Sequence, residues 1–111
     1  MKYVALIYGD QAGWDALSEE EQQQVMGRYI ALGQESIVTG GSELEDPDTA
    51  TTVRVRNGER LTTDGPFAET KEQLGGFYLL DCGSIDEALE FAARIPAAQR
   101  GAVEVRPLVE R

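Results

Sequence analysis

The sequence contains no histidine, and this absence excludes several kinds of active site. Histidine is the commonest general base and a frequent metal ligand, so Ser-His and Cys-His nucleophile pairs and imidazole metal sites are ruled out. There is only one cysteine, Cys82, so no internal disulfide can form. The cysteine content therefore gives no indication of an oxidising compartment.

Basic residues are also scarce, with ten Lys and Arg against twenty Asp and Glu, which gives a net charge of −10. Such an acidic chain is a poor fit to nucleic-acid phosphates or anionic lipids, so we expect neither partner. Long apolar runs are absent too: the first one, Lys2–Tyr8, ends at Gly9-Asp10. A spanning helix needs about 20 apolar residues and a secretory segment needs a cleavage site. We therefore expect a cytoplasmic protein.

Phosphate-cradling glycine loops and recognisable metal motifs are missing as well. The loop Gly9–Gly13 is not followed by the helix start that a phosphate site needs. The acidic residues between Glu43 and Asp48 lack the alternating ligands and central glycine of an EF-hand loop. The sequence therefore predicts no cofactor and no metal site.

What the sequence does contain is a regular series of strand and helix patterns in a single domain over residues 1–111. Two capping boxes, Ser18–Glu21 and Ser84–Glu87, predict helix starts. Asn57-Gly58 predicts a tight hairpin turn. The predicted order is a strand at 2–8, a helix from 18 to just before Gly40, a short strand near 42–44, a hairpin at 51–63, a strand at 77–80, a helix ending at Pro96 and a strand at 102–108.

The two most apolar strands predict how the elements pack. Lys2–Tyr8 and Phe77–Leu80 are apolar at both alternating sets of positions, which is typical of strands buried on both faces. Two helices cover only one face of such a sheet. We therefore predict an α+β, ferredoxin-like βαββαβ sandwich with an inserted β-hairpin, whose open sheet face is covered by a second copy in a homodimer.

The run Thr63–Phe77, which begins Thr-Asp-Gly-Pro-Phe, closely resembles the signature of the DGPF family of YCII-related proteins. The resemblance extends over nearly the whole chain and implies a ferredoxin-like fold and a dimeric α+β barrel. It leaves the biochemical function unassigned. The YCII branch is associated with a catalytic His–Asp pair and includes a dehydrochlorinase-like lyase, but this chain has no histidine to supply that pair.

Asp64, inside the signature, is the candidate catalytic residue, because a partly buried carboxylate can accept a proton. The alternative is a local role, in which its side chain accepts N–H bonds in the Asp-Gly-Pro turn.

The candidate ligand-binding residues are Lys71, Arg54, Glu69, Glu72 and Tyr8. The segment that carries Glu69, Lys71 and Glu72 is either a flap over a pocket, hinged at Gly75-Gly76, or a solvated loop. Arg54 either binds an anionic ligand or, together with Arg56, lies on a solvated face. The Tyr8 hydroxyl either reaches a ligand or belongs to the core.

Three functional hypotheses follow. The first is a small dimeric protein that binds a small anionic or phenolic molecule near Asp64–Glu72. The second is a cofactor-free lyase or isomerase in which Asp64 accepts a proton and Lys71 stabilises negative charge. The third is a non-catalytic regulatory or interaction module that works through its acidic surface.

Overall fold

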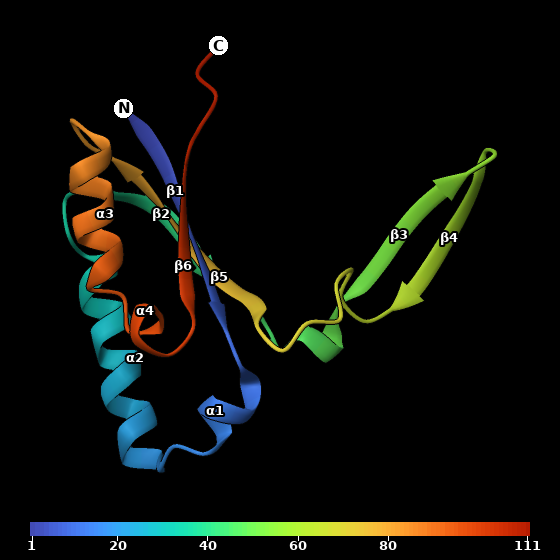
Figure 1. Ribbon diagram of the computed structural model, residues 1–111, viewed down its shortest axis with the longest axis horizontal. Helices are drawn as coiled ribbons and strands as arrows, with labels where there is room; N and C mark the ends of the chain where they lie inside the picture. The colour runs from blue at the N-terminus through green and yellow to red at the C-terminus, as the bar shows by residue number, and fades with distance from the viewer.

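The computed structural model describes residues 1–111 and combines a four-stranded sheet, helices on one face of that sheet, and a separate two-stranded hairpin (Figure 1). In chain order the elements are β1 (Lys2–Gly9), α1 (Gln11–Asp15), α2 (Glu19–Gly33), β2 (Val38–Glu43), the 3-10 turn η1 (Pro47–Thr49), β3 (Thr51–Arg56), β4 (Glu59–Asp64), β5 (Gln73–Asp81), α3 (Ile85–Ala93), α4 (Ala97–Arg100) and β6 (Ala102–Pro107).

The main sheet has the strand order β2-β5-β1-β6, and all of its neighbours are antiparallel. This mixed α+β arrangement is compatible with the predicted ferredoxin-like fold. The central positions belong to β1 and β5, the two strands whose sequences are apolar at both alternating sets of positions. None of the helices has the length and hydrophobicity of a transmembrane span.

The core lies between the sheet and the helices. Tyr3 and Ala5 of β1 and Leu80 of β5 are buried against Phe91 and Ile95 from the α3 region. Helices α2 and α3 stand on the same side of the sheet, as predicted (Figure 1). Only nine of the 111 residues are buried, which is a small core for a chain of this length.

The opposite face of the sheet has no helix over it. Val4 lies opposite Leu79, and Leu6 lies opposite Phe77. Because neighbours across a sheet point to the same side, these four side chains form one apolar surface on the face away from the core. We call this surface the open face. Its residues are only half-buried.

Strands β3 and β4 form a hairpin, here called the arm (Thr51–Asp64), that projects away from the body (Figure 1). The predicted tight turn is confirmed, because Asn57 and Gly58 have φ values of 54° and 75°. Every residue of the arm is exposed except Thr52, which is half-buried. The radius of gyration, 15.8 Å, exceeds the value of about 13 Å typical of a compact domain of this size, because of this projection.

The first long helix ends earlier than predicted. It stops at Gly33 instead of continuing to Gly40, and Val38–Glu43 is already strand β2. The cause lies outside the helix sequence: Val38 pairs with Leu80, and Gly41 has a φ of +149° where it passes β5. Only tertiary pairing, which local spacing does not reveal, selects the strand here.

Smaller differences occur in three short segments. The predicted loop after Gly9 contains helix α1, and the residues after Pro96 form α4. In α3, Leu89 is 49% exposed, although its spacing predicts an inward position, and Phe91 at 1% exposure occupies the core instead. The larger aromatic ring therefore sets the inward face of this helix.

Gly41 and its neighbour Gly40 provide a matched test of the β2–β5 contact. A Cβ at Gly41 would overlap the Phe77 carbonyl oxygen, whereas one at Gly40 would lie 3.4 Å from the Leu79 Cδ1 atom. We expect Gly41→Ala to lower the free energy of unfolding by at least about 2 kcal/mol, because the clash involves backbone and the φ is unsuited to alanine. Gly40→Ala should cost less than about 1 kcal/mol. Equal losses in urea titrations of the two variants would contradict this account.

Candidate functional site

A cleft of about 410 Å³ lies between the sheet and the first two helices. We call it the helix-side cleft. Its apolar lining comes from β1, α1, α2 and β5, that is, from segments far apart in the sequence: Ile7, Trp14, Met26, Tyr29 and Tyr78. Volume and lining are in the range typical of small-molecule sites.

Trp14 is held over this cleft by hydrogen bonds at both ends of α1. Asp10 caps the helix, because its side chain accepts the Ala12 N–H at 3.0 Å. The Gln22 side chain on α2 donates to the Trp14 carbonyl oxygen at 3.0 Å. These bonds tie a short helix, which would not be stable alone, to the body of the protein.

Two tyrosines line the helix-side cleft and are joined by a hydrogen bond. The Tyr78 hydroxyl donates to the Tyr29 carbonyl oxygen at 2.7 Å, and the Tyr78 ring packs edge-on against Phe91. Burial raises the pKa of Tyr78 to about 12. Burial also raises the pKa of Tyr29, and a backbone hydrogen bond from Ala97 opposes the shift. Both hydroxyls therefore keep their protons at neutral pH, and each oxygen retains lone pairs that can accept a hydrogen bond.

The rim of the helix-side cleft is acidic. Glu43, Glu45 and Asp46 line it on the side of β2, and Asp10 lines it at the start of α1. Lys71 forms an ion pair with this rim: its Nζ lies 3.9 Å from the Asp10 Oδ2 atom, and its side chain is 85% exposed. An exposed pair at that distance adds little binding energy of its own. The rim therefore repels anions more than it attracts them.

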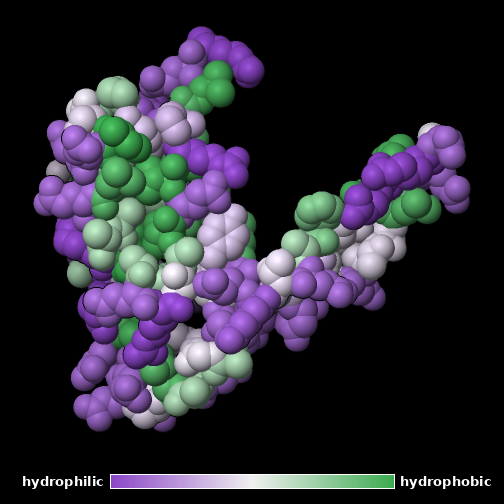
Figure 2. Space-filling model, in the orientation of Figure 1, coloured by the Kyte–Doolittle hydropathy of each residue, from purple (hydrophilic) through white to green (hydrophobic).

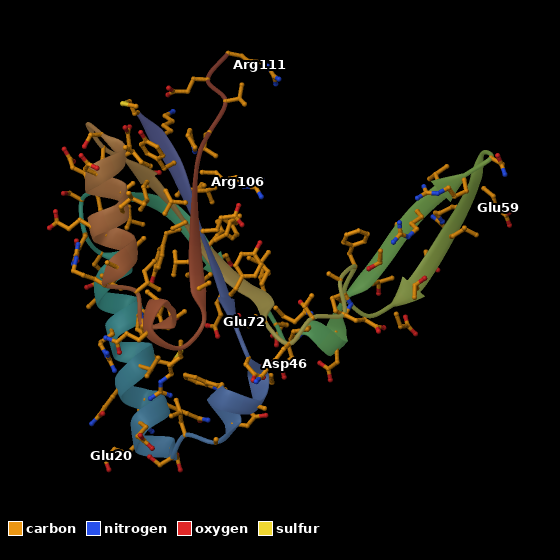
Figure 3. All side chains as sticks on the ribbon, in the orientation of Figure 1. Glu20, Asp46, Glu59, Glu72, Arg106 and Arg111 are labelled. Atoms are coloured by element: carbon orange, nitrogen blue, oxygen red, sulfur yellow. The ribbon has the colours of Figure 1, made fainter.

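A second cleft, of about 550 Å³, lies where the arm leaves the body. We call it the arm-side cleft. Tyr8 and Leu74 of the sheet line one part of it, and Pro66 and Phe67 at the base of the arm line another. Figure 3 shows Asp46 and Glu72 close to this junction.

The signature stretch builds the base of the arm. The Gly65 N–H donates to the Ala50 carbonyl oxygen at 2.7 Å, and the Thr52 hydroxyl donates to the Gly65 carbonyl oxygen at 2.8 Å. The Arg54 guanidinium lies over the Phe67 ring at 4.9 Å from its centroid. These contacts give Gly65 and Phe67 of the motif a structural role.

Comparison with known proteins identifies the chain. The family model of the YCII-related domain matches residues 1–111 of the sequence. The chain belongs to the YCII-related domain family. An uncharacterised protein of Rhizobium meliloti (strain 1021) is 44% identical over 114 residues, which cover 97% of this chain and 92% of that protein. This relative brings no assigned function with it.

In this YCII-related domain, the predicted ligand-binding residues divide between different places. Tyr8 and Glu72 both line the arm-side cleft. Lys71 pairs with Asp10 at the rim of the helix-side cleft, and Arg54 lies on the arm. Glu69 is exposed and lines neither cleft. Their ligand-binding roles stay predictions.

Asp64 ends strand β4 and is exposed. Its side chain forms no hydrogen bond or ion pair, so the expected turn contacts through its carboxylate are not made. The motif turn is held instead by the backbone of Gly65. Asp64 lines neither cleft, and its proposed catalytic role stays a prediction.

The predicted hinge at Gly75-Gly76 is wrong. Both glycines lie inside β5, where Gly76 pairs with Ile7 on one side and Glu43 on the other. The Gly75 carbonyl oxygen also accepts the Leu44 N–H at 2.9 Å. Paired on both sides, this segment cannot open as a hinge. Close backbone approach explains the glycine at 76, since a Cβ there would lie 2.8 Å from the Ser42 carbonyl oxygen.

Sequence reasoning missed Met26, Tyr29 and Asp10 as cleft residues. Met26 and Tyr29 are three positions apart on one helix and so have the spacing of ordinary core residues. Asp10 lies in a segment predicted to be a loop. Its position just before α1 is a usable signal, because aspartate is a preferred N-cap residue.

Removing one hydroxyl tests the tyrosine pair. We expect Tyr78→Phe to lower the free energy of unfolding at pH 7 by about 1 kcal/mol, because the Tyr29 carbonyl loses its donor. A folded-state pKa above the ordinary value of 10 stabilises the protein fully below pH 10, and this stabilisation is lost as the pH rises toward 12. The wild type should therefore lose stability more steeply over that range than the variant, in urea titrations at one protein concentration.

Tyr8→Phe is the control, since no hydrogen bond of the Tyr8 hydroxyl exists within the chain. A Tyr78→Phe protein as stable as the wild type at pH 7 and equally pH-dependent above pH 10 would contradict the role of this hydrogen bond.

Proposed function

We propose that this YCII-related protein binds a small, uncharged molecule with an aromatic or aliphatic ring and a hydroxyl group, such as a phenol, in the helix-side cleft. The observation that carries this proposal is the combination of an apolar, aromatic lining with a rim of carboxylates. Trp14 and Tyr29 offer ring faces to an apolar body. The carboxylates accept a hydrogen bond from a ligand hydroxyl and repel a carboxylate or phosphate. Of the anionic and phenolic ligands expected from the sequence, the phenolic class is the better fit.

We propose further that the protein works as a homodimer joined through the open face. Val4, Leu6, Phe77 and Leu79 leave an apolar surface on the side of the sheet that no helix covers. A second copy with the same surface removes both from water, and a twofold axis makes the two surfaces self-complementary. The small number of buried residues within one protomer supports this assignment.

Trp14 is the only tryptophan, so its fluorescence reports directly on the helix-side cleft. We expect neutral substituted phenols to change this fluorescence saturably and to bind more tightly than benzoates that carry the same ring substituents. A like charge about 4 Å away costs roughly 1 kcal/mol in water, which corresponds to about fivefold in affinity. Asp46→Asn should therefore narrow the gap between phenols and benzoates by about that factor.

Asp48→Asn provides the matched control, because Asp48 lies on the same turn but lines neither cleft. Tighter binding of benzoates than of phenols would contradict the proposal. So would amide chemical-shift changes that exclude the neighbourhood of Trp14, Tyr29 and Tyr78.

A further inference from the structure

The arm has an apolar face that nothing within the chain covers. Val53 and Val55 point to the same side of β3 and are 57% and 59% exposed. Thr62, opposite Val53 on β4, adds a methyl group to this side, and Arg60, opposite Val55, adds its aliphatic stem and its positive charge. Arg54 and Arg56 alternate with the valines and point to the other side of the hairpin. We call the surface of Val53, Val55 and Thr62 the valine face.

The contacts that hold the arm in place are made at its base. The hydrogen bonds of Gly65 with Ala50 and Thr52, and the packing of Phe67 under Arg54, all occur where the arm begins. Figure 3 places Glu59 near the far end, well away from the body. A two-stranded hairpin alone in water is at best marginally stable, so the outer part of the arm needs a further surface to pack against.

The arm and the open face enclose a wide space between them. Figure 2 shows this space as a gap between the body and the projecting hairpin. The arm-side cleft lies at its closed end, because its lining joins Tyr8 and Leu74 of the sheet to Pro66 and Phe67 of the arm base. One side of the arm-side cleft is therefore open toward the space between the arm and the open face.

The charges on the chain favour a second copy as the occupant. The arm carries three arginines (Arg54, Arg56 and Arg60) against Glu59 and Asp64, a net charge of +1. The other residues hold seven basic and eighteen acidic side chains, a net charge of −11. The arm of one molecule is thus attracted to the body of another, although the molecules as wholes repel. A symmetric pair makes this contact twice.

We propose that each arm lies along the body of a second copy, with its valine face against that copy, and that the second copy supplies the missing wall of the arm-side cleft. The inference rests on the homodimer proposed above and adds what the arms do in it. It follows that the arm-side cleft is enclosed only in the dimer, and that Tyr8 and Glu72 line a site that one chain cannot complete.

The contact between the valine face of one copy and the body of the other is here called the clasp. The double variant Val53→Ser/Val55→Ser tests it. Both side chains are exposed in the protomer, so the change leaves the protomer core intact. We expect the dimer dissociation constant, measured by sedimentation over a range of concentrations, to rise by at least about tenfold, because apolar area buried in the contact is lost. Ile30→Ser is the matched control, since Ile30 is 60% exposed on α2 and should leave the constant unchanged.

The outcomes separate the two proposals. A wild type that stays monomeric at all concentrations overturns both the homodimer and the clasp. A dimeric wild type whose constant is the same in the double variant overturns the clasp alone. The clasp is supported if the double variant weakens the dimer and the Ile30→Ser control leaves it unchanged.

A spin label locates the outer end of the arm directly and does not depend on a destabilising change. The spin label is attached to the cysteine of Glu59→Cys in a Cys82→Ser background. This protein is mixed with wild-type protein that carries no spin label and is enriched in nitrogen-15. We expect signal broadening in the enriched copy at amides of its body. Broadening confined to the arm of the enriched copy, or none in a sample shown to be dimeric, would overturn the proposal.

Discussion

The structure depends on one mismatch between its sheet and its helices: the two central strands are apolar on both sides, but helices cover only one side. Tyr3 and Ala5 of β1 are buried under α2 and α3, whereas Val4 and Leu6 of the same strand face away from them. The covered side supplies the small core and the cleft beneath Trp14. The uncovered side creates the need for a partner, since apolar surface left in water is unfavourable.

The signature stretch has a structural role within this arrangement. Its glycine and phenylalanine close the base of the arm, through the hydrogen bonds of Gly65 and the packing of Phe67 with Arg54. The same residues form one side of the arm-side cleft. The contacts of Gly65 and Phe67 favour an architectural role for this part of the motif, because a projecting hairpin needs a rigid base. The acidic rim of the helix-side cleft comes from β2, the residues just after it and the start of α1, and its Glu45 lines the arm-side cleft as well.

The parts of the fold that local chemistry determines were predictable. The capping boxes at Ser18 and Ser84 place the helix starts correctly, and Asn57-Gly58 places the hairpin turn. The parts that failed depend on distant neighbours: the helix end before Val38 and the role of Gly76 are both decided by pairing with another strand. The helix-side cleft was not predictable for the same reason, since its lining comes from separate segments whose spacing in sequence carries no common signal.

Whether the open face is covered by a second copy is decided by the molar mass of the wild-type protein in solution, measured by sedimentation equilibrium from nanomolar to hundred-micromolar concentration at neutral pH. We expect twice the 12.1 kDa of one chain once the concentration exceeds the micromolar range, with reversible dissociation below it. A mass of one chain at every concentration would show that the open face is stable in water, and would contradict the account.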